Sequence, residues 1–168
     1  MESPPLHPDL APVAWLLGTW SGTGRGEYPT IDTFTYEETI TFAHVGKPFL
    51  SYIQRTRHAV DGRALHSESG YWRFPRPGRV EVVIAHPTGI AEVLEGEIER
   101  GAIVLRSTAV GATGTAKSVA ATERLFIFAP ETAPTSLTYR IAMAAVGLPL
   151  THHLSASLAR QGASSPSV

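Results

Sequence analysis

The chain has 168 residues, a length typical of a single domain. It contains no cysteine, which excludes disulfides, cysteine zinc sites, iron–sulfur clusters and covalently attached haem. The 14 basic and 15 acidic residues give a formal net charge of −1, so no strong field attracts nucleic acid or an anionic membrane. We therefore expect neither nucleic acid nor a membrane as a partner.

The sequence shows neither a signal-peptide pattern at its start nor a stretch long enough to span a membrane. Residues 1–8 lack the basic and apolar regions of a signal peptide, and the longest nearly apolar stretch, 141–150, is far shorter than the ~18 residues of a membrane span. We expect a cytoplasmic protein with one domain over residues 1–168. Its folded core should cover about residues 8–161, and the Ser-rich tail over 162–168 should be disordered.

The pattern along the chain predicts one short helix followed by strands. The helix is expected over 10–17, with Asp9 as its cap. Beyond it, apolar and polar residues alternate almost everywhere, and glycine- or proline-containing turns such as Asp61-Gly62 recur at short spacing. We predict ten strands, over 19–26, 33–44, 48–59, 64–75, 79–86, 90–98, 102–110, 117–128, 135–144 and 150–159.

Ten short strands without crossover helices predict an antiparallel meander, which must form a sandwich or close into a barrel. Polar residues occupy both faces of some strands, as where His66 and Glu68 alternate with Ser67 and Ser69. A cavity lined by side chains accepts this pattern better than a packed core does. We therefore predict an all-β, about ten-stranded antiparallel barrel, resembling lipocalins and fatty-acid-binding proteins.

The glycine-rich segment 18–26 lacks the Lys-Ser/Thr of a phosphate-binding loop, and no helix pattern follows it. Its glycines instead suit a first strand that bends and lets another backbone approach. In this interpretation Trp20 fills the end of the barrel beside the N-terminal helix.

The histidines are dispersed along the chain and form no His-Glu-x-x-His motif, so we expect no dedicated zinc site. His152 and His153 are adjacent and would point to opposite faces of a regular strand, so only one can face a cavity. His152 shares its face with Leu154, whereas His153 shares its face with Ser155. Alternation alone leaves open which of the two faces inward.

Several segments together resemble the nitrobindin family, whose members are small ten-stranded barrels that bind haem without covalent attachment. The segments are Gly18-x-Trp20-x-Gly22-x-Gly24, Tyr28-Pro29-Thr30-Ile31, and the stretches 42–50, 65–71, 85–89, 115–119 and 145–158. The resemblance spans about residues 8–161.

The resemblance implies a set of site residues for haem b. His153 matches the family's axial iron ligand, and it is the catalytic residue expected here. Thr30 matches a residue that contacts the haem, and Lys117 matches a further one that suits a propionate. The family's ferric iron is described as five-coordinate and open to solvent, with no distal histidine.

The implied function is binding of nitric oxide at ferric iron and isomerisation of peroxynitrite to nitrate, by a monomer or homodimer. One alternative is an intracellular carrier of a fatty acid or other apolar molecule, with a carboxylate clamp such as Arg140 and Tyr52. Tyr139 faces away from Arg140 and fits such a clamp poorly. Another alternative is haem bound for sensing or storage without turnover.

Overall fold

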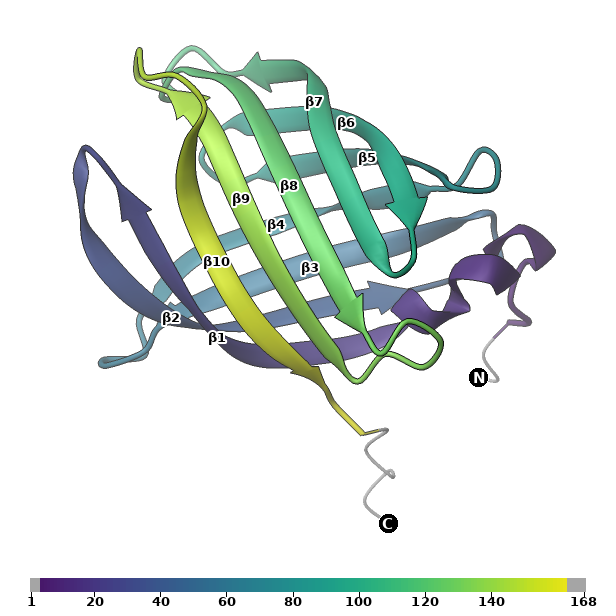
Figure 1. Cartoon of the computed structure of the whole chain (residues 1–168). Coiled ribbons are helices and arrows are strands. Elements are labelled where there is room, and N and C mark those ends of the chain that lie inside the picture. Colours follow the sequence, from purple (N-terminus) through teal and green to yellow (C-terminus); the bar gives the residue numbers. More distant parts are fainter. Residues whose placement is uncertain (1–3, 163–168) are drawn as a thin grey trace.

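The chain forms a closed antiparallel barrel of ten strands, as the alternation predicts (Figure 1). The computed structural model describes residues 4–162, so the tail predicted over 162–168 lies outside the described residues from 163 onward. The elements are η1 (Pro8–Leu16), β1 (Gly18–Tyr28), β2 (Ile31–Ala43), β3 (Phe49–His58), β4 (Ala64–Arg73), β5 (Arg79–His86), β6 (Ile90–Glu99), β7 (Ala102–Ala112), β8 (Val119–Ala129), β9 (Ser136–Ala145) and β10 (Thr151–Arg160).

Each strand pairs with the next one along the chain, and β10 pairs with β1 to close the barrel. Every strand begins and ends within two residues of its predicted bounds. The predicted and observed bounds agree because apolar and polar residues alternate regularly along the strands. In most strands the inward positions are buried and the outward positions are exposed. Among residues 4–162, no helix has both the length and the apolar character that crossing a membrane demands.

The N-terminal helix differs from the prediction in type and start. It is a 3-10 helix that begins at Pro8, and His7 rather than Asp9 caps it: the Asp9 backbone N–H donates to His7 Nδ1 at 3.3 Å. The prediction of Asp9 as cap is therefore wrong. Proline is pre-set for the first turn of a helix, which moves the start two residues toward the N-terminus.

The helix covers one end of the barrel, which is filled by apolar side chains (Figure 1). Leu10 and Leu16 are completely buried there. Trp20 donates its indole N–H to the Leu16 carbonyl at 3.1 Å and packs edge-on against Phe128 with ring centroids 5.2 Å apart. The role predicted for Trp20, filling this end beside the helix, is confirmed.

The start of β1 and the end of β10 lie together beside the helix. The Gln161 backbone N–H donates to the Thr19 carbonyl at 2.8 Å, and the Arg160 guanidinium donates to the Leu17 carbonyl at 2.5 Å. The β1–β2, β3–β4, β5–β6, β7–β8 and β9–β10 connections lie at the opposite end of the barrel, which we call the mouth.

Candidate functional site

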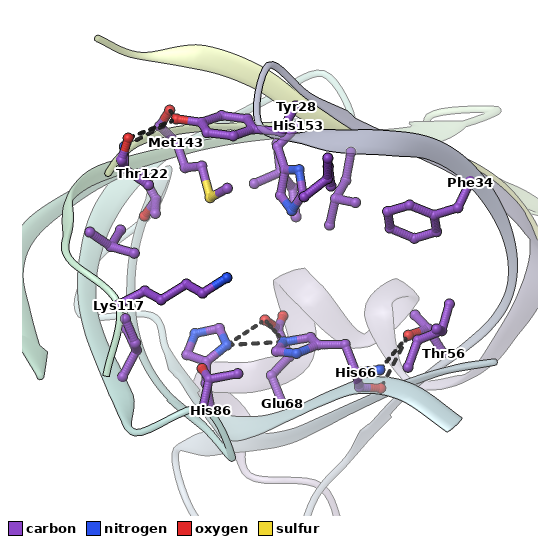
Figure 2. Close-up of a pocket in the computed structure, with 18 of the residues that line it drawn as sticks. Tyr28, Phe34, Thr56, His66, Glu68, His86, Lys117, Thr122, Met143 and His153 are labelled. Atoms are coloured by element: carbon purple, nitrogen blue, oxygen red, sulfur yellow. Dashed lines mark hydrogen bonds and ion pairs between the residues drawn. The ribbon is translucent and has the colours of Figure 1, made fainter. Parts of the chain in front are cut away.

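A cavity of about 930 Å³ lies inside the mouth half of the barrel. Its walls come from nine of the ten strands and from the connections at the mouth, including the β7–β8 connection (Figure 2). Apolar residues such as Leu65, Ile90, Val119 and Met143 alternate with hydroxyl, histidine and carboxylate side chains. The volume is at the upper end of the roughly 300–1,000 Å³ of small-molecule and cofactor sites.

A β-bulge in β10 decides which of the two adjacent histidines faces this cavity. His152 pairs with Ala142 and Leu154 pairs with Ile141, so His153 is the extra residue between them. A bulge shifts the alternation by one residue. His153 and Leu154 therefore both line the cavity, whereas His152 does not. The expected sharing of a face by His152 and Leu154 is wrong for the same reason.

The ring of His153 is fixed with one nitrogen bonded and the other directed into the cavity (Figure 2). Nδ1 lies 3.0 Å from the Glu27 carbonyl oxygen, and the Tyr28 ring stands edge-on at 5.5 Å. A carbonyl oxygen only accepts, so Nδ1 carries the hydrogen and donates it. Burial lowers the pKa of His153, which keeps the ring neutral. Nε2 thus holds the free lone pair that a metal ligand needs.

Thr30 and Lys117 stand at the mouth, on connections that are far apart in sequence. Thr30 follows β1 in the β1–β2 turn, and Lys117 precedes β8. Both are exposed and both border the cavity, and the Lys117 side chain extends toward its interior (Figure 2). The fold thus brings all three site residues expected from the sequence around one cavity.

The wall opposite His153 carries a polar cluster that sequence reasoning missed (Figure 2). His66 and Glu68 come from β4 and His86 ends β5, about halfway round the barrel from β10. His66 Nε2 and His86 Nδ1 are 3.1 Å apart. No short motif connects these strands, and the resemblance implied no distal histidine. The inward alternation of His66 and Glu68 was the available signal.

A buried ion network holds this wall in place. Arg124 donates to Glu68 Oε1 at 2.6 Å, to Glu68 Oε2 at 3.1 Å and to Glu92 Oε1 at 2.7 Å. Burial alone would raise the pKa of both carboxyls, but the Arg124 guanidinium outweighs it, holding the pKa of Glu92 at about 2 and that of Glu68 well below its usual range. Both carboxylates are therefore ionised at neutral pH.

The carboxylate clamp expected for a fatty-acid carrier is absent from residues 4–162. Arg140 is exposed on the outside of the barrel while Tyr52 is buried, so that predicted pair is wrong. Tyr52 instead donates to Glu68 at 2.7 Å. Arg124 is a buried cation of the cavity wall, and Glu68 and Glu92 already engage it.

A second polar group lies between the cavity and the packed end. Tyr139 donates to Glu38 Oε2 at 2.6 Å and lies 2.7 Å from the Tyr36 hydroxyl, and the Gln54 amide donates to the other Glu38 oxygen. Burial raises the pKa of Glu38 to about 7. This carboxyl thus exchanges its proton near neutral pH.

Comparison with known proteins places this geometry among haem-binding barrels. Residues 9–160 match the family described as the THAP4-like, heme-binding beta-barrel domain. Peroxynitrite isomerase 2 of Mycobacterium ulcerans is 52% identical over 160 residues, covering 93% of this chain and 97% of the relative. Peroxynitrite isomerase of Nocardia farcinica is 52% identical over 159 residues, covering 92% of each. The crystal structure of Rv2717c from M. tuberculosis superposes with a TM-score of 0.85 at 46% identity, covering 94% of this chain and 100% of that one.

Proposed function

Since the chain belongs to the THAP4-like haem-binding β-barrel family, as its motifs predicted, we propose that it holds haem b through His153 and isomerises peroxynitrite to nitrate. The observation that carries this proposal is the bulge in β10, which turns one histidine into the cavity with Nε2 free. The chain has no cysteine, so attachment is non-covalent.

The volume and polarity of the cavity support haem as its ligand. The apolar side chains around it would hold the macrocycle, and the mouth would leave the propionates in contact with water. Lys117 and Thr30 stand at that mouth, where an ammonium and a hydroxyl can bind carboxylates through charge-assisted hydrogen bonds. The Glu27 carbonyl orients His153, as the outer partner of a metal-bound histidine usually does.

When bound, ferric haem supplies an iron centre that takes nitric oxide and promotes the rearrangement of peroxynitrite. Peroxynitrite and nitrate contain the same atoms, so the net conversion requires no proton or electron from the protein. His153 then serves as a fixed, neutral ligand, and the barrel wall limits which molecules reach the iron. One chain lines this cavity, which is compatible with a monomer or a homodimer. We also propose a cytoplasmic location.

Titration of the purified chain with hemin tests the ligand assignment. We expect a Soret band in wild type and in His152→Ala, and its loss in His153→Ala, because only residue 153 faces the cavity. His152→Ala is the matched control, one residue away on the same strand. Equal hemin binding by both variants would contradict the assignment.

A second measurement separates turnover from mere haem binding. The nitrate yield from peroxynitrite should be higher, and its decay faster, with the loaded protein than with an equal amount of free hemin. An equal rate for free hemin would leave sensing or storage as the better description. Substitution of His152 should not change the rate.

A further inference from the structure

The wall opposite His153 brings three metal-ligand atoms together at the spacing of a coordination site. His66 Nε2 lies 3.1 Å from His86 Nδ1, and Glu68 Oε2 lies 3.8 Å from the first and 3.5 Å from the second. Metal–ligand bonds of about 2.0–2.2 Å in a tetrahedral site separate the ligand atoms by about 3.3–3.6 Å. The three atoms thus approximate one face of such a tetrahedron.

We propose that His66, Glu68 and His86 bind a divalent transition-metal ion of the Zn²⁺ type, separately from the haem ligand His153. Two imidazoles and one carboxylate form the ligand set of many zinc sites, whereas Mg²⁺ and Ca²⁺ prefer oxygen alone. All three residues line the cavity, so the fourth position opens into it.

The partners behind these ligands support a built site. His86 Nε2 lies 2.7 Å from Glu92 Oε1, which is the carboxylate–histidine arrangement that orients a metal-binding ring. With its hydrogen on Nε2, His86 presents a lone pair on Nδ1. Arg124 and Tyr52 fix the Glu68 carboxylate, which is only 4% exposed.

The hydrogen-bonding pattern also suits a cation. Glu68 and Glu92 both engage the single guanidinium of Arg124. His66 Nε2 and His86 Nδ1 lie at hydrogen-bond distance, so one of them carries the hydrogen between them. A metal ion would replace this shared hydrogen, and His66 would stay neutral by keeping its other hydrogen on Nδ1.

Metal titration of the full-length, haem-free chain tests the proposal. Zn²⁺ should bind with 1:1 stoichiometry by calorimetry, and Co²⁺ in its place should give the visible bands of low-coordinate cobalt. His66→Ala and His86→Ala should each weaken binding at least ~100-fold, and Glu92→Gln by about 10–100-fold, as expected for an outer partner. His66 is partly exposed, so its substitution should leave the barrel folded, which circular dichroism checks.

Two control variants separate this site from other histidines. His153→Ala should lose hemin but keep Zn²⁺, so failure of the haem proposal and failure of the metal proposal give different results. His44→Ala, whose side chain does not line the cavity, should bind Zn²⁺ as wild type does. The proposal is overturned if wild type binds neither ion, if His66→Ala binds equally well, or if His153→Ala abolishes binding.

Discussion

The same strands form both ends of the barrel, but apolar side chains fill one end whereas a cavity with polar side chains occupies the other. On β4, Trp72 packs into the apolar end, where its ring meets Phe126 with centroids 5.6 Å apart, while His66 reaches the cavity. On β8, Phe126 belongs to the packed end and Thr122 to the cavity wall. The difference teaches that stability and chemistry are separated along the barrel axis, so substitutions at one end should leave the other largely unaffected.

The largest effect on stability is expected from removal of an aromatic side chain at the packed end. Phe126→Ala should lower the free energy of unfolding by about 3–5 kcal/mol, because Phe126 is 1% exposed and its loss leaves a cavity. Urea denaturation measures this change, and hemin affinity should stay within about twofold. The matched variant Leu65→Ala, at the cavity wall, should cost clearly less stability. Equal costs would contradict the separation.

A smaller effect on stability is expected from ionisation of Glu38, which lies between the two ends. The pKa of Glu38 is about 7 in the folded chain against an ordinary value of 4.5, so between these pH values only the folded chain holds the proton. The contribution of Glu38 to the free energy of unfolding is therefore fully present below pH 4.5 and is lost as the pH rises through 7. Relative to Glu38→Gln, wild type should lose about 3 kcal/mol between pH 4.5 and pH 8.

Urea denaturation of both proteins across this range measures the difference. The comparison with Glu38→Gln removes the contributions of the other titrating groups, including those of His153. A constant difference in stability between the two proteins would show that Glu38 titrates normally.

The smallest effect on stability is expected at the mouth. Lys117→Ala should change the free energy of unfolding by no more than about 0.5 kcal/mol, because the side chain is exposed. It should weaken hemin binding about two- to fivefold at low salt, the size expected of an exposed charge pair, and less at high salt. Lys47→Ala, in the β2–β3 connection at the helix end, is the matched control. Identical hemin affinity in both variants would remove Lys117 from the site.

The strands and the closed end could be predicted from the sequence because their signals are local. Alternation located the inward side chains and predicted the barrel, whereas the family was indicated by the resemblance of several short segments. The choice between His152 and His153 could not be derived from alternation, since a single extra residue in β10 reverses it. The wall opposite was also missed, because Glu68 and Arg124 are 56 residues apart and meet only through the barrel.

The pairing of β1 with β10 also has a consequence for how the barrel can be joined to other polypeptides. Gly18 and Arg160 lie beside the helix, at the far end from the mouth (Figure 1). A polypeptide joined directly after Arg160 or ahead of the helix would therefore start at the packed end. Ligand entry should remain unobstructed in such fusions, and the barrel can be appended to larger proteins as a self-contained module.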